Sequence, residues 1–117
     1  MRNHKQFKFW DNLIELLIRS YRFTGTLPAS DQFALGAEIK RLTVRCRMSV
    51  VDAGACEAAP DCARSLELAY RQVKELGSCI EFVGELGMAK LELVDDLIPS
   101  CDRMAGAIYS YRRSLLE

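Results

Sequence analysis

The stretch LELAYRQVKELGSCIEFVGELG, residues 66–87, decides the fold. Two apolar ladders with a seven-residue repeat, offset by three, run through it: Leu66, Val73, Ile80 and Gly87, and Ala69, Leu76 and Val83. Alternating spacings of three and four residues keep apolar side chains on one stripe of an α-helix, which then packs against other helices. The stretch therefore predicts a long amphipathic helix.

The same spacing recurs on both sides of this stretch. It appears upstream as Phe7, Trp10, Ile14, Leu17 and Tyr21, then as Leu35, Ile39, Leu42, Cys46, Val50 and Ala53, and downstream as Val94, Leu97, Cys101, Met104, Ile108, Tyr111 and Leu115. We therefore expect four helices, over residues 7–23, from Ser30 or Asp31 to 53, 61–86 and 90–116. Because the connections are short, the prediction is an all-α, antiparallel four-helix bundle with up-down-up-down topology, a single domain over residues 1–117.

Glycine and proline mark the expected helix ends. Gly25 and Pro28 separate the first two helices, and Gly87 ends the third. Proline suits a first helical turn, so Pro60 is expected near the start of the third helix. Pro99 lies inside the fourth helix and is expected to kink or split it, since proline removes a backbone hydrogen bond. Gly77 and Gly84, one heptad apart, predict a close approach by another helix of this chain or a neighbour.

Charge is unevenly distributed although the 117 residues carry no net charge. Residues 1–47 contain nine Lys and Arg against four Asp and Glu, a surplus of five, whereas residues 75–102 contain one against seven. Opposite blocks of this kind neutralise each other between helices or subunits. No apolar run has the length of a signal peptide or a membrane span, so the expected localisation is cytoplasmic, and the five cysteines are expected to be reduced.

Basic side chains gather on one face of the second predicted helix: Lys40, Arg41, Arg45 and Arg47. At 100° per residue they cover an arc of about 160° opposite the apolar stripe. They are the candidate nucleic-acid-binding residues, since such groups contact phosphates without reading sequence. The alternative is a solvated face that pairs with acidic residues of the third and fourth helices.

Catalytic and cofactor motifs are absent from the sequence. His4 is the single histidine, the Glu-x-x-His pair of di-iron bundles does not occur, and neither do P-loop, GxGxxG or GxSxG patterns. No cysteine pair has zinc-site spacing. We therefore expect no catalytic residues, no metal site and no cofactor.

Read in order, the chain contains a set of short motifs: Phe9-Trp10, Leu27-Pro28, Asp31-Gln32-Phe33-Ala34-Leu35-Gly36, Ile39-Lys40-Arg41, Ala69, Glu75-Leu76 and Leu86-Gly87. In this ordered set the chain resembles the bacterial four-helix bundle proteins associated with intervening sequences of the large-subunit ribosomal RNA. The chain is also similar to a relative of this bundle, the accessory variability determinant of diversity-generating retroelements. The resemblance implies a homo-oligomer, typically a pentamer, that acts as an adapter for RNA and a reverse transcriptase.

The region after the second helix departs from the family. The family usually has a Pro-x-Asn-x-x-Glu-Gly pattern there, followed by a basic loop. In this chain the corresponding residues 47–53 lack that pattern, and the loop that follows them up to Asp61 is mildly acidic. Three functions follow as alternatives: a non-enzymatic oligomeric adapter for nucleic acid or a nucleic-acid enzyme, a protein-interaction scaffold without nucleic acid, or an enzyme. Self-association is expected because the aromatic residues outnumber the inward positions of a small bundle.

Overall fold

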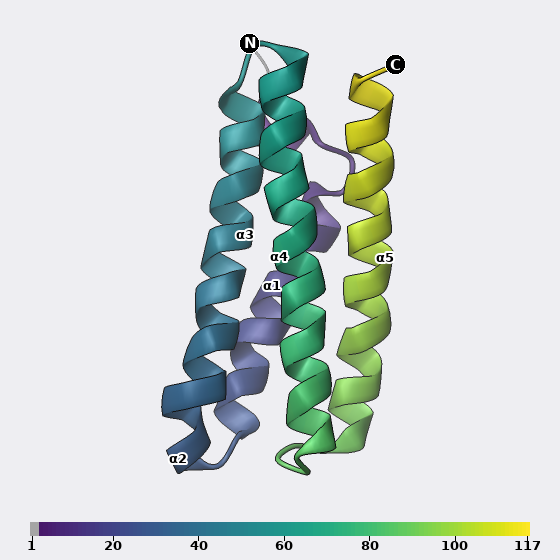
Figure 1. Cartoon of the computed structure of the whole chain (residues 1–117). Coiled ribbons are helices and arrows are strands. Elements are labelled where there is room, and N and C mark those ends of the chain that lie inside the picture. Colours follow the sequence, from purple (N-terminus) through teal and green to yellow (C-terminus); the bar gives the residue numbers. More distant parts are fainter. Residues whose placement is uncertain (1–2) are drawn as a thin grey trace.

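Four long helices form the bundle, and each runs antiparallel to the one before it (Figure 1). The structure is a computed structural model that describes residues 3–117. The helices are α1 (Trp10–Phe23), α3 (Ala37–Ala55), α4 (Ala59–Glu85) and α5 (Leu91–Leu115). The predicted all-α, up-down-up-down bundle is therefore confirmed. Among the described helices, none is long and apolar enough to span a membrane.

The first helix begins later than the sequence predicts. A 3₁₀ turn, η1 (His4–Gln6), comes first, and α1 starts at Trp10 rather than near Phe7. Phe7 has an extended backbone with ψ of 130°. In a helix Phe7 and Phe9 would point about 200° apart, but with the chain extended at Phe7 both rings are buried and stacked, with centroids 5.2 Å apart. Burial of both rings accounts for the late start.

A wide turn opens the second helix. After the 3₁₀ turn η2 (Thr24–Thr26), the chain forms one α turn, α2 (Ala29–Asp31), then a π-helical segment, η3 (Gln32–Gly36), and continues into α3. The start lies at Ala29, directly after Pro28, and neither Ser30 nor Asp31 acts as the N-cap. Instead Gln32 Nε2 donates to the carbonyl oxygen of Leu27 at 2.9 Å. The π segment leaves Phe33 on the outside with 90% of its surface exposed.

The turn between α4 and α5 follows the prediction. Gly87 has a φ of +71°, in the left-handed region that glycine adopts without strain. The amide of Met88 donates to the carbonyl of Val83 at 3.2 Å, and that of Gly87 to Gly84 at 3.0 Å, which closes the end of α4. The helix α5 then runs unbroken through Pro99, so the expected split does not occur.

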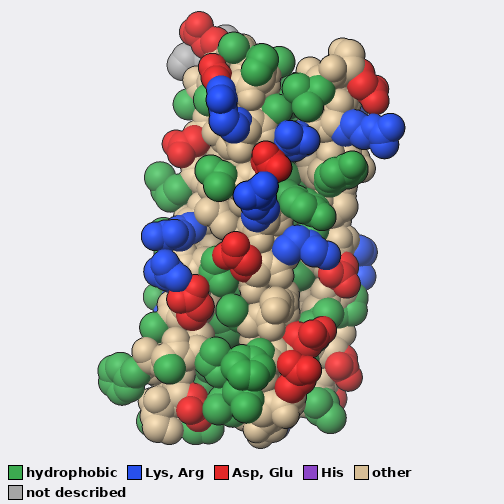
Figure 2. Space-filling model, viewed as in Figure 1, with side chains coloured by type: hydrophobic (Ala, Val, Ile, Leu, Met, Phe, Trp, Pro, Cys, Tyr) green, Lys and Arg blue, Asp and Glu red, His purple; other side chains and the backbone are tan. Residues whose placement is uncertain are grey.

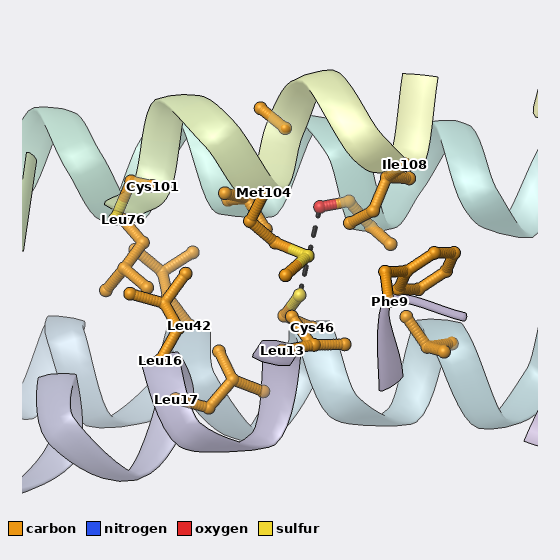
Figure 3. Packing of buried hydrophobic residues seen from close by; sticks show 14 of the residues in the cluster. Phe9, Leu13, Leu16, Leu17, Leu42, Cys46, Leu76, Cys101, Met104 and Ile108 are labelled. Carbon is orange, nitrogen blue, oxygen red and sulfur yellow. Dashed lines mark hydrogen bonds between the residues drawn. The ribbon is translucent and has the colours of Figure 1, made fainter. Parts of the chain in front are cut away.

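The predicted stripes form the core. All six non-glycine residues of the two ladders in α4 are fully buried. A Cβ atom on Gly77 would lie 3.3 Å from Cβ of Cys101, and one on Gly84 would lie 3.0 Å from Cγ1 of Val94. The close approach predicted at these glycines is therefore made by α5 of the same chain. Figure 3 shows the core between α1, α3 and α5, where the Cys46 thiol lies beside Met104 and points to the carbonyl oxygen of Ala69, 3.8 Å away.

Candidate functional site

The four predicted phosphate-binding residues lie on α3 but on two different sides of it. Lys40 Nζ lies 5.1 Å from the ring centroid of Tyr21, and Arg47 Cζ lies 5.1 Å from that of Trp10, so both face α1. Arg41 and Arg45 belong to the row with a four-residue spacing that continues to Ser49. Ser49 donates to Gln72 of α4 at 2.8 Å. This second pair therefore lies along the α4 side.

Apolar side chains occupy the space between the two pairs. Val44 and Met48 are 55% and 50% exposed, and their helical angles fall within the arc of the four cations. The predicted basic face is thus two cationic edges with an apolar strip between them. On the face shown in Figure 2, Lys and Arg side chains are interspersed with Asp and Glu, and the lower end is apolar and acidic.

The four cations of α3 do not form the ion pairs with acidic residues of α4 and α5 that the alternative interpretation predicts. Arg41 forms an ion pair with Glu38 of its own helix, and both side chains are largely exposed, so the pair contributes little stability. Within residues 3–117, none of the four cations forms an ion pair with a carboxylate of α4 or α5. Arg45 forms no ion pair in that part of the chain. A solvent-facing cation without a bound carboxylate keeps its donors available for a partner.

A shallow apolar pocket lies between α1 and α3, beside the strip. It has a volume of about 190 Å³, and its lining is formed by Ile14, Leu17, Ile18, Tyr21, Thr43, Val44 and Arg47. The sequence places Tyr21 in the buried stripe of the first helix, but 46% of it is exposed at this pocket. Helical spacing alone did not reveal the pocket, because Ile18 and Val44 fall outside every predicted stripe. We call the pocket together with Met48 the α1–α3 face.

A second, larger groove of about 640 Å³ separates α1 from α5. It runs along both helices, because its lining extends from Phe9 to Arg19 on the α1 side and from Ser100 to Tyr111 on α5. Leu16, Met104 and Tyr111 supply apolar lining, while Lys8 and Arg103 supply positive charge. An ion pair between Arg19 and Asp96 joins the two helices. The groove therefore combines apolar lining with charges of both signs, since Glu15 also lines it.

The buried thiols are poor candidates for chemistry. Burial, with Cys101 nearby, raises the pKa of the Cys46 thiol to about 12. Burial, with Asp102 nearby, likewise raises the pKa of Cys101 to about 12. Cys62 is buried in the first turn of α4. Since the thiolate is the reactive form, the raised pKa values of Cys46 and Cys101 favour inert thiols at these two positions. Within residues 3–117, no three His, Cys, Asp or Glu side chains converge in a way that could hold a metal ion.

Comparison of the chain with models of known protein families finds no match. Comparison with the curated proteins finds no match either. The resemblance to the ribosomal intervening-sequence family therefore stays a hypothesis, which rests on the ordered residues quoted above.

Proposed function

We propose that this protein is a non-enzymatic helical-bundle adapter that self-associates and binds protein through its α1–α3 face. The observation that carries the proposal is the apolar strip between cationic edges, with Val44 and Met48 half exposed beside Tyr21. Exposed apolar surface rimmed by polar groups is typical of interaction sites. Tyr, Met and Arg are also the residues enriched at protein interfaces. Phosphate-binding surfaces, by contrast, are usually continuous and basic.

Charge supports a head-to-tail contact between copies. The α1–α3 face is bordered by Lys40 and Arg47, whereas the far end of α4 and the start of α5 carry the acidic surplus. Exposed apolar side chains accompany the acidic residues there: Phe82, Leu86, Leu91 and Leu93. A contact between two different surfaces repeats from copy to copy and closes into a ring where the rotation allows it. The pentamer implied by the resemblance is one such ring.

Substitution of Val44 tests whether the α1–α3 face is the surface through which copies self-associate. Val44→Glu places a carboxylate in the middle of the strip, so it should weaken self-association while the helical circular dichroism signal is retained. Leu68→Glu is the matched control, because Leu68 is a similarly exposed apolar residue on α4. If both variants associate like the wild type, the α1–α3 face is not the interface. If only the control dissociates, the interface lies on α4.

Nucleic acid is the second candidate partner, alone or together with a reverse transcriptase as the resemblance implies. A specific observation favours it: Lys40 and Arg47 rest on aromatic rings, and a cation–π contact leaves N–H donors free. Arg45 adds a charge that no carboxylate binds within the described residues. A ring of copies would repeat these cations and multiply a weak phosphate contact.

A further inference from the structure

Phe33 is the most exposed large apolar side chain among the described residues, with 90% of its surface accessible. It lies in η3, where the backbone forms a π-helical turn rather than an α-helical one. Such wide turns are rare and occur mostly at functional sites. Phe33 therefore projects from the bundle as an isolated apolar knob.

The pocket of the α1–α3 face has the size and chemistry to accept an aromatic ring. Its volume is about 190 Å³, and an apolar cavity of about 150 Å³ is large enough to hold benzene. Leu17 and Thr43 are buried at the pocket, and Ile18 and Val44 form exposed walls. Tyr21 adds an aromatic wall on which Lys40 rests. Phe33 does not occupy the pocket of its own chain, because its ring is almost fully exposed.

Charge makes the knob and the pocket complementary. The segment η3, which carries Phe33, lies at the same end of the bundle as the turn between α4 and α5, where the acidic surplus lies (Figure 1). Arg47 lines the pocket, and Lys40 lies at its edge over Tyr21. A ring that entered the pocket would bring this acidic end toward these two cations. The opposite arrangement, an acidic knob that approaches an acidic pocket, would be repelled.

We propose that Phe33 of one copy inserts into the α1–α3 pocket of a second copy. This inference rests on the proposed self-association and names the side chain that anchors it. Knob and pocket are different surfaces of one chain, so two copies can exchange knobs in an isologous dimer, or successive copies can make heterologous contacts that close a ring. Anchors of this kind, an aromatic side chain in a desolvated pocket, carry most of the affinity of an interface.

Site-specific photocrosslinking maps the contact directly. The full chain is prepared with p-benzoylphenylalanine at position 33 and, as the matched control, at position 109, where an exposed tyrosine lies. Irradiation of the position-33 protein should give intermolecular crosslinks to residues 14–21 or 43–47. The position-109 protein should not crosslink there. Crosslinks from position 33 to other segments, or none in a sample that is oligomeric, would overturn the inference.

Substitution separates this inference from the proposed function. Phe33→Ser should lower the association constant at least about tenfold, as expected for an interface anchor. Leu68→Ser, which also removes an exposed apolar side chain, should change it far less. If the wild type associates and Phe33→Ser associates equally well, the anchor is wrong and self-association stands. If the wild type is monomeric, both proposals fail.

Discussion

The backbone of His4 lies directly against Gly54 of α3: a Cβ atom on Gly54 would be 2.7 Å from Cα of His4 and 2.9 Å from its Cβ. No side chain fits in that space without displacing the η1 turn. The turn is held from the other side as well. The His4 ring packs edge-on against Trp10, with centroids 4.6 Å apart, and Arg47 covers Trp10. Gly54 is thus the position that lets the N-terminal turn close one end of the bundle.

Gly54→Ala should release this turn. The close approach involves backbone atoms of His4, so it cannot be relieved by a side-chain rotation. We expect a cost of about 1–3 kcal/mol, the range for overpacked sites. Trp10 is the only tryptophan and is buried, so its fluorescence should shift to longer wavelength. Gly106→Ala, at an open helical position, is the control. An unchanged Trp10 spectrum in Gly54→Ala would contradict the packing described.

Gly84 and Gly106 should respond in opposite directions to alanine. Alanine is favoured over glycine inside a helix by about 1 kcal/mol, and Gly106 has nothing within 4 Å of its Cβ position. Gly106→Ala should therefore raise the free energy of unfolding. Gly84→Ala brings a Cβ to 3.0 Å from Cγ1 of the buried Val94, which should cancel that gain and destabilise the bundle. Urea denaturation measures both; equal gains would mean that α4 and α5 are not closely packed there.

High pH should destabilise the bundle through its buried thiols. Burial raises the pKa of Cys46 from 9.0 to about 12. Above pH 9 the thiol loses its proton in the unfolded chain and keeps it in the folded protein, so stability falls as pH rises toward 12. Each such thiol should contribute a slope of about 1.4 kcal/mol per pH unit.

Cys46→Ala tests this directly. The variant should be less stable at neutral pH, because it leaves a cavity. Its stability should nevertheless fall less steeply between pH 9 and 12 than that of the wild type. Parallel curves for the two proteins would show that the Cys46 thiol titrates normally.

How far the sequence predicts this structure depends on whether a feature is periodic or local. The ladders of α4 and the glycine stop at Gly87 follow from spacing and are found as predicted. The start of α1 could not be predicted from spacing, because burial of both Phe7 and Phe9 requires a local extended backbone. The π turn at Phe33 likewise has no periodic signal.

The candidate site likewise has features that helical spacing predicts and features that it does not. Helical angles correctly put Lys40, Arg41, Arg45 and Arg47 outside the core, but the outward arc also contains apolar residues. Val44 and Met48 lie in the same arc and separate the cations into two edges. The pocket beside them could not be predicted from spacing, because it forms where α1 packs on α3. That packing depends on contacts between residues far apart in the sequence.

Nucleic-acid binding, if the second candidate function holds, should depend on the α4-side edge. Arg41→Gln with Arg45→Gln should weaken RNA or DNA binding across sequences. It should also reduce the slope of log affinity against log salt by just under about one for each lost phosphate contact. The matched control is Arg64→Gln with Arg71→Gln, two exposed arginines on α4. Equal binding by the double variant and the wild type would show that Arg41 and Arg45 make no phosphate contact.

The molar mass of the wild-type protein in solution tests the central claim most directly. Sedimentation equilibrium at several concentrations in the micromolar range measures it without reference to shape. We predict a mass that is a multiple of the 13.2 kDa chain, five-fold if the pentamer implied by the resemblance forms. Because the acidic end of the bundle and the cations Lys40 and Arg47 are expected to meet across the contact, high salt should shift the equilibrium toward smaller species. A mass of 13.2 kDa at every concentration and low salt would contradict self-association.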